Sequence, residues 1–240
     1  MPNQYFQFKK FMVQQDKCSM KVCTDSCLFG AWVAHKTVRK LITPKRVLDI
    51  GTGTGLLSLM LAQKITAQID AVDIDSKACM QARENFHASP WSEHLQVFNS
   101  GIQEWAAPGK YDLIISNPPF YENDLLPKDT GKNISKHSAV LSLNELLIIA
   151  GTLLSDNGNF AVLLPWHRAK GFESAALAGS FFITEKTEVR PTPRHDYFRT
   201  MLILQKHATI INQSRMSIKD NSNEYTQEFV DLLKDYYWHL

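Results

Sequence analysis

Arg46-Val-Leu-Asp-Ile-Gly-Thr-Gly-Thr-Gly55 is the stretch that decides the fold of this chain. Its first five residues form a short apolar strand, and leucine and methionine then recur at helical spacing from Leu56. The glycines at every second position of the turn carry no side-chain bulk, so backbone N–H groups can approach a ligand closely. Strand, glycine turn and helix in this order predict a cofactor site at the carboxyl end of a parallel strand.

The middle of the chain continues to alternate strand-like and helical runs, which predicts an α/β, Rossmann-like, mostly parallel sheet with helices on both faces. Seven strands are expected: 46–50, 68–73, 94–98, 111–116, 160–164, 181–189 and 200–205. The last two form an antiparallel hairpin at the sheet edge. We expect a single domain over residues 1–240, with a segment covering the cofactor and substrate at 1–45, a catalytic core at 46–206 and a C-terminal helical extension at 207–240.

Composition places few restrictions on the partners of the chain. With 240 residues and 44% hydrophobic content it can bury a full core, and its net charge of +2 is too small to indicate nucleic-acid binding by itself. The first thirty residues contain no uninterrupted apolar stretch of signal-peptide or membrane-span length. We therefore expect a cytoplasmic protein without a membrane partner. The four cysteines lack paired metal-site spacing, and no metal is expected.

The glycine spacing argues against a dinucleotide cofactor. That fingerprint needs glycine at position 56 or 58, where this chain has Leu56 and Ser58. A carboxylate at the end of the second strand, Asp73, can accept hydrogen bonds from a ribose diol, whereas Asp75 is well placed to begin the next helix. A glycine-rich turn can also serve only tight strand–helix packing. The expected cofactor contacts here are Asp49, Gly51, Thr52, Gly53, Gly55, Asp73 and Ile74.

Asn117-Pro118-Pro119-Phe120 follows the apolar run Tyr111 to Ser116 and is the expected catalytic motif. The Asn117 side-chain oxygen and the Pro118 carbonyl can accept the two hydrogens of a planar amino group, turning its lone pair toward a methyl donor. The prolines restrict the local backbone, and Phe120 offers a face for a flat base. A rigid turn after a strand is the alternative. Together with the glycine turn and Asp73, the motif indicates methyl transfer to an amine or amide nitrogen.

The glycine turn resembles the first motif of class I S-adenosylmethionine-dependent methyltransferases. Most of the chain, roughly 8–205, resembles the bacterial tRNA(Val) adenine-N6 methyltransferase family. The features that carry this resemblance are the segment Lys21 to Trp32, the glycine turn, Asp73, the 117–120 motif and the basic loop after 189. The resemblance implies S-adenosyl-L-methionine as the cofactor, with Lys21, Thr24 and Asp25 over its methionine end. This chain has Cys23 where relatives usually have glycine. It also has Gly101 where an acidic residue commonly meets the adenine amine, which leaves backbone groups of Ile102 for that contact.

The resemblance further implies a tRNA partner whose adenosine beside the anticodon enters the site from an unpaired loop. Two clusters of basic and aromatic residues are candidates for binding that RNA. Each can equally be an ordinary solvated surface whose aromatic rings pack against the protein. The candidate substrate contacts are Lys9, Lys10, Arg190, Arg194, Tyr197, Phe198 and Arg199. We expect the chain to act as a monomer on the anticodon loop.

Other nitrogen acceptors fit the same motif. A ribosomal RNA guanine-N2 or DNA adenine methyltransferase has closely similar chemistry, and Asn-Pro-Pro also suits a protein glutamine N5-methyltransferase. Those glutamine enzymes usually carry a helical domain ahead of the catalytic fold, and only fifty residues precede Gly51 here. Outside this class, an NAD-dependent oxidoreductase conflicts with the glycine spacing, and a catalytically idle RNA-binding module leaves the 117–120 motif unexplained.

Overall fold

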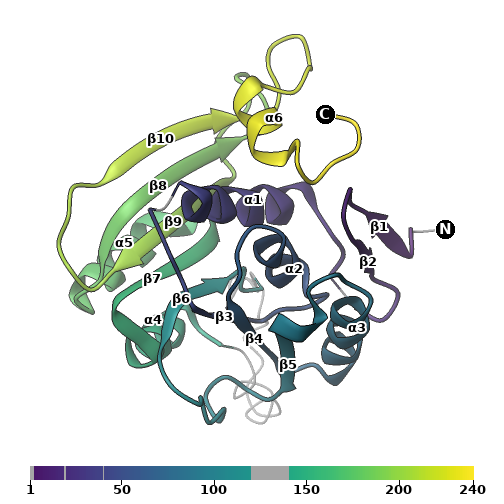
Figure 1. The fold of residues 1–240 in the computed structure, drawn as a ribbon. Helices are drawn as coiled ribbons and strands as arrows, with labels where there is room; N and C mark the ends of the chain where they lie inside the picture. Colours follow the sequence, from purple (N-terminus) through teal and green to yellow (C-terminus); the bar gives the residue numbers. More distant parts are fainter. Residues whose placement is uncertain (1–2, 19, 40, 120–140) are drawn as a thin grey trace, which may run out of the picture.

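An eight-stranded sheet forms the centre of the molecule (Figure 1), and the computed structural model describes residues 3–18, 20–39, 41–119 and 141–240. The strand order is β10-β8-β9-β7-β6-β3-β4-β5, and β1 pairs with β2 in a separate antiparallel ribbon. The strands are β1 Tyr5–Gln7, β2 Met12–Gln14, β3 Arg46–Ile50, β4 Gln68–Asp73, β5 Leu95–Asn99, β6 Tyr111–Ser116, β7 Leu154–Pro165, β8 Phe182–Arg190, β9 Arg199–Gln205 and β10 Asn212–Ser217. The helices are α1 Thr24–Val38, α2 Leu56–Ala62, α3 Ser76–His87, α4 Leu143–Leu153, α5 Trp166–Ala178 and α6 Gln227–Leu233, with a short 3-10 turn, η1, at Ser92–His94.

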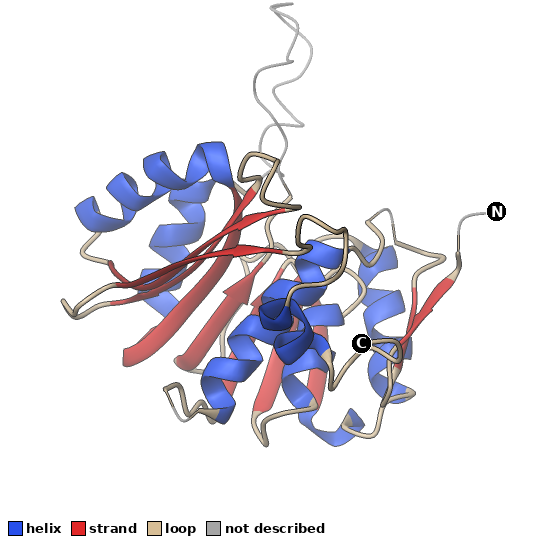
Figure 2. Ribbon diagram, turned by 90° about the horizontal axis from the view of Figure 1, so that it is seen from above, coloured by secondary structure: helices blue, strands red, loops and turns tan. Residues whose placement is uncertain are grey.

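Helices cover both faces of this sheet (Figure 2). On one face α1, α2, α3 and α6 pack against strand side chains such as Val47 and Leu113. On the other face α4 and α5 pack against the alternate side chains, such as Leu48 and Ile114. Because successive side chains of a strand point to opposite faces and both faces are buried, these strands read as continuous apolar runs. The predicted α/β fold class is confirmed.

The sheet has eight strands where the sequence predicts seven, because β10 pairs in parallel with β8. The sequence of β10 is Asn-Gln-Ser-Arg-Met-Ser, and most of its side chains are exposed. It lacks the apolar alternation that indicates a strand, and its backbone pairing with β8 places it in the sheet. The predicted antiparallel hairpin of β8 and β9 is present, but β10 lies outside it at the edge. Residues after 206 therefore supply a strand as well as α6.

The N-terminal part of the chain contributes a core helix rather than only a cover. Ten residues of α1 are buried, and the helix packs against α2 and α6. The β1–β2 ribbon adds Phe8 and Phe11, whose stacked rings lie 4.4 Å apart, to the same core. Docking of α1 also carries the residues at its N-terminal end to the carboxyl ends of the strands.

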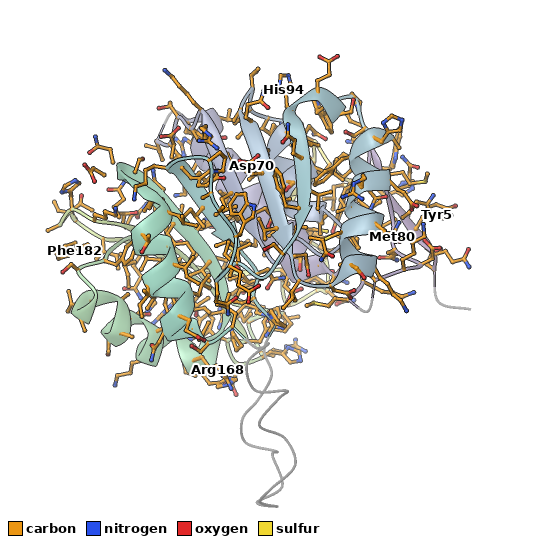
Figure 3. The ribbon with its side chains drawn as sticks, turned by 90° about the horizontal axis from the view of Figure 1, so that it is seen from below. Tyr5, Asp70, Met80, His94, Arg168 and Phe182 are labelled. Atoms are coloured by element: carbon orange, nitrogen blue, oxygen red, sulfur yellow. The ribbon has the colours of Figure 1, made fainter. Side chains whose placement is uncertain are left out.

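A buried polar cluster fixes the opposite, amino ends of the central strands. One carboxylate oxygen of Asp70 accepts hydrogen bonds from the Tyr111 hydroxyl at 2.7 Å and from Arg46 at 3.1 Å. The Arg46 guanidinium also lies 4.8 Å from the centre of the Tyr111 ring. Burial, and then the hydrogen bond to Asp70, raise the pKa of Tyr111 above its ordinary range, so the phenol stays a neutral donor. Figure 3 shows Asp70 among the strands.

Gly55 offers a direct test of this packing. It begins α2 at φ +81°, and a Cβ there would lie 2.4 Å from the Phe86 ring. Gly55→Ala is expected to lower the free energy of unfolding by about 2–4 kcal/mol, because it combines left-handed strain with overpacking. Urea denaturation followed by circular dichroism measures the change. Gly171→Ala within α5 is the control, since its Cβ meets nothing within 4 Å and should be neutral or slightly stabilising. Equal stability of Gly55→Ala and wild type would contradict the described contact.

Candidate active site

A cavity of about 410 Å³ lies at the carboxyl ends of the parallel strands. It forms between the neighbouring strands β3 and β6, where the strand order reverses. The sheet extends from β3 through β4 to β5 on one side and from β6 to β7 on the other. Neighbouring strands at such a point send their following helices to opposite faces, which leaves a crevice between them. The hydroxyl of Ser116 donates to the Ile50 carbonyl oxygen at 2.9 Å and holds the two strand ends together at the cavity wall.

The glycine turn forms the floor beside β3. Gly51, Gly53 and Gly55 have φ values of +72°, +57° and +81°, a region that favours glycine. Gly51 and Gly53 line the cavity, and a Cβ at either would meet no atom within 4 Å. The space next to this backbone is therefore open to a ligand. Gly55, by contrast, lies against Phe86 and serves the packing of α2.

Asp73 lies at the end of β4, in the cavity wall. One of its carboxylate oxygens accepts from the backbone N–H of Gly53 at 2.8 Å, and the other from that of Asp75 at 2.9 Å. These two bonds fix the carboxylate and still leave lone pairs, since an ionised carboxylate has about four acceptor sites. The side chain of Asp75 caps α3 by accepting from the Lys77 N–H at 2.9 Å, as its position before the helix predicts.

The adenine end predicted for the cofactor coincides with a mainly apolar part of the cavity. Ile74, Gly101 and Ile102 all line it, and so does Gln103, which the sequence analysis missed. The Gln103 side-chain oxygen lies 3.5 Å from the point that a Cβ of Gly101 would occupy. A polar amide thus lies next to the position where the resemblance leads us to expect an acid. Cys18, Met20, Ala78 and Leu141 are further lining residues, and no motif in the sequence marks them.

Asp49 supports the glycine turn from inside the protein. The side chain is fully buried, and one oxygen accepts from the hydroxyls of Thr52 and Ser58, each at 2.7 Å. Its other oxygen has no hydrogen-bond partner among the described residues. Burial raises the pKa of Asp49 to about 6, and the two hydroxyl bonds oppose that rise. Asp49 and Thr52 are not among the described lining residues, and they shape the turn behind the cavity wall.

The Asn117 amide is oriented by Ser26 of α1. Its Nδ2 donates to the buried Ser26 hydroxyl oxygen at 2.8 Å. The Asn117 Oδ1 atom is buried and has no hydrogen-bond partner within the described part of the chain. Pro118 and Pro119 line the cavity beside it, while Phe120 lies outside the described residues. The arrangement leaves a buried acceptor oxygen in a residue that lines the cavity, next to the stiff proline backbone.

The predicted methionine-end residues surround the start of α1. Thr24 is its first residue and is exposed, and Lys21 is exposed with its ammonium donating to the Asn3 carbonyl at 3.2 Å. Asp25 pairs with Arg199, with 2.7 Å between Oδ2 and Nε, and its other oxygen accepts from the Ser26 N–H at 3.0 Å. None of Lys21, Thr24 and Asp25 is among the described lining residues. Asp25 joins the helix start to β9.

The predicted substrate contacts fall into two separate groups. Arg190, Arg194, Tyr197, Phe198 and Arg199 lie between the end of β8 and the start of β9. Lys9 lies in the turn between β1 and β2, where its backbone N–H donates to the Tyr236 carbonyl at 2.8 Å and its ammonium donates to the Lys234 carbonyl near the end of α6. Lys10 is exposed next to it. Lys9 is thus used to join the ribbon to the C-terminal segment.

Residues 28–163 match the methyltransferase small domain family. Over 242 aligned residues the chain is 40% identical to a tRNA1(Val) (adenine(37)-N6)-methyltransferase of Parabacteroides distasonis, with 99% of each chain covered. A protein of the same name from Trichodesmium erythraeum is also 40% identical, again over 99% of each chain. The chain belongs to the same methyltransferase family as these two proteins. Its cofactor is S-adenosyl-L-methionine, and the open glycine turn, the Asp73 carboxylate and the volume of the cavity fit that molecule.

Solved structures share the fold of this methyltransferase. A predicted O-methyltransferase from Agrobacterium tumefaciens superposes with a TM-score of 0.67 at 15% identity, covering 88% of this chain and 96% of that one. An S-adenosylmethionine-dependent methyltransferase from Clostridium acetobutylicum superposes with a TM-score of 0.55 at 14% identity, covering 78% of this chain and 94% of that one.

Across 3–18, 20–39, 41–119 and 141–240, no three His, Cys, Asp or Glu side chains group closely enough to bind a metal ion. No described helix is both long and apolar enough to cross a membrane.

Burial of Asp49 predicts a pH dependence of stability. Its pKa rises from an ordinary 3.8 to about 6 in the folded chain, so the native state holds this proton more tightly than the unfolded state. The resulting penalty is absent below pH 3.8 and fully present above pH 6, which corresponds to a loss of roughly 3 kcal/mol as pH rises. Urea unfolding of wild type and Asp49→Asn at pH 4 and pH 8 should show the difference between the two proteins change by about that amount. A difference that stays constant with pH would contradict the assignment.

Proposed function

We propose that this methyltransferase transfers a methyl group from S-adenosyl-L-methionine to N6 of adenosine 37, beside the anticodon of tRNA(Val). The observation that carries the proposal is the Asn117 amide, whose nitrogen is bound by Ser26 and whose buried oxygen is left as an acceptor at the cavity. The choice of RNA and position is supported by two relatives, named tRNA1(Val) (adenine(37)-N6)-methyltransferases, that are 40% identical over 99% of their length. We further propose that it acts as a cytoplasmic monomer with a single catalytic domain.

The cofactor supplies an electrophilic methyl group on a sulfonium. The backbone of Gly51 and Gly53 would permit its close approach, and Asp73 would accept hydrogen bonds from the two ribose hydroxyls. Ile74 and Ile102 would hold the adenine ring, and the Gln103 amide lies next to the position where the resemblance leads us to expect an acid. By resemblance, Lys21, Thr24 and Asp25 cover the methionine end.

The acceptor nitrogen needs a change of geometry before it can attack. The lone pair of an exocyclic adenine nitrogen is delocalised into the ring, which makes it a poor nucleophile. The Asn117 Oδ1 and the Pro118 carbonyl oxygen each accept a hydrogen bond from one N–H group of the adenine amine. These bonds favour a tetrahedral nitrogen whose lone pair points at the methyl group. As the carbon–nitrogen bond forms, the methyl–sulfur bond breaks and S-adenosyl-homocysteine is left. The nitrogen proton becomes acidic only then and passes to solvent water, so no general base is required beforehand.

RNA reaches the cavity from the side of the loop between β8 and β9. Arg190, Arg194 and Arg199 hold phosphates there, and Tyr197 or Phe198 contacts a neighbouring base. The target adenosine leaves its stack, at least cost from a loop that is already unpaired, and Phe120 offers a face for the base. Lys9 and Lys10 provide a second site for phosphate at the N-terminal ribbon.

The test is methylation of unmodified tRNA with isotopically labelled cofactor, followed by mass spectrometry of the nucleosides and mapping of the labelled position. N6-methyladenosine at position 37 of tRNA(Val) is the expected product. N2-methylguanosine in ribosomal RNA, methyladenine in DNA or N5-methylglutamine in protein would redirect the assignment to one of the other acceptors of the same motif. No transfer to any of these substrates by cofactor-loaded protein would reject it.

We expect Ser26 to contribute to catalysis by holding the Asn117 side-chain amide in one orientation. Asn117→Ala removes the acceptor and should lower kcat about 10²- to 10³-fold while cofactor binding is retained. Ser26→Ala leaves the amide able to rotate and should lower kcat about 3- to 10-fold with little change in KM for the cofactor. Ser26→Thr keeps a hydroxyl and should recover most of the activity. Steady-state kinetics and cofactor titration measure these effects, and wild-type kcat in Ser26→Ala would show that the hydroxyl does not position the amide.

A further inference from the structure

An aromatic and basic cluster beside the β8–β9 loop joins two predicted substrate contacts, Arg190 and Tyr197, to two residues that the sequence does not mark, Trp166 and Arg215. Trp166, the first residue of α5, is 44% exposed, and its ring stacks on Tyr197 with centroids 6.3 Å apart. The guanidinium carbons of Arg190 and Arg215 lie 5.4 and 5.6 Å from the centre of the same Tyr197 ring. We call these four residues the Trp166 platform.

Glu188 holds two members of the Trp166 platform in place. It is only 8% exposed, and its two carboxylate oxygens accept from the Trp166 indole N–H and from Arg215 Nε, each at 3.0 Å. Burial tends to raise the pKa of Glu188, but these hydrogen bonds and the nearby positive charges outweigh it and lower the pKa below its ordinary value. The ionised carboxylate therefore fixes the edge of the indole, while the Arg215 side chain remains 67% exposed.

The Trp166 platform lies at the same edge of the sheet as the active site. The backbone N–H of Trp166 donates to the Phe198 carbonyl at 3.0 Å, and its neighbour Pro165 pairs with Arg199 in the sheet. Arg199 in turn pairs with Asp25, which precedes the serine that binds the Asn117 amide. Because β6 and β7 are adjacent and parallel, Trp166 and Asn117 also follow strand ends on the same edge of the sheet. A chain entering the cavity at this edge can therefore contact the platform.

We propose that the Trp166 platform binds an unpaired nucleotide next to the target adenosine, with its base against the Trp166 indole and its phosphate at Arg215. This inference rests on the proposed function, because it presumes an RNA loop in the cavity. The chemistry of the platform fits that ligand. A ring held at its edge offers a flat face to any base, and the arginines supply positive charge for a phosphate. Two acidic residues lie near the platform. The negative charge of Glu188 is balanced by its hydrogen bonds to Trp166 and Arg215, and Asp196 is exposed to solvent.

The experiment measures binding of an unmodified anticodon stem-loop RNA to the cofactor-loaded protein over a range of salt concentrations. Trp166→Ala should weaken binding about 5- to 150-fold, the range for loss of one stacked base, while cofactor affinity stays unchanged. Trp166→Phe keeps an aromatic face and should lose much less. Arg215→Ala should weaken binding and flatten its dependence on log salt by about 0.7, as expected for one phosphate contact.

Two matched variants control for general effects. Trp238→Ala removes another exposed tryptophan, in the C-terminal tail, and Arg39→Ala removes an exposed positive charge after α1. Both should bind the RNA like wild type. Unchanged RNA affinity in both Trp166→Ala and Arg215→Ala, while wild type binds and methylates the RNA, would overturn the platform and leave the proposed function intact. Failure of wild type to bind any RNA would overturn both the platform and the proposed function.

Discussion

The hydrogen bond between Asn117 and Ser26 is the interaction on which the site depends. An amide has a donor end and an acceptor end, and binding the nitrogen to a buried hydroxyl decides which end remains for a substrate. The two residues are 91 positions apart, so the bond exists only when α1 has docked on the sheet. Docking of the N-terminal segment and orientation of the proposed catalytic amide are therefore coupled. A buried acceptor without a partner is costly, and in the mechanism that we propose a substrate amino group would remove that cost on binding.

The two ends of the central strands serve different purposes. At the amino ends, Arg46, Asp70 and Tyr111 satisfy one another in a closed polar cluster. At the carboxyl ends, Asp49 and Asn117 each keep a buried oxygen unpaired within the described structure, and the glycine turn holds three residues at positive φ. Of these two oxygens, only that of Asn117 belongs to a residue that lines the cavity, whereas Asp49 lies behind the wall and supports the glycine turn. A division between the two ends of the strands is expected where function requires local strain.

The sequence predicts those parts of the site that local patterns determine. The glycine turn, Asp73 and Asn117 each follow an apolar strand, and parallel strands bring their carboxyl ends to one edge. Ser26 and Trp166 carry no such pattern, because their contacts with Asn117 and Glu188 join distant segments, and Gln103 lies in a loop that no motif marks. The strand β10 is missed for a related reason: its side chains are mostly exposed, and only backbone pairing with β8 places it in the sheet. The assignment of Lys9 and Lys10 to RNA rests on composition alone, and Lys9 is also used to join the ribbon to α6.

The most direct measurement is a crystal structure of the protein with S-adenosyl-homocysteine and an unmodified anticodon stem-loop. We expect the N6 atom of the target adenosine within hydrogen-bond distance, about 2.8–3.2 Å, of Asn117 Oδ1, with Nδ2 still donating to Ser26. An amide turned so that Nδ2 faces N6, or an adenosine seated elsewhere with Oδ1 more than about 4 Å from N6, would contradict it.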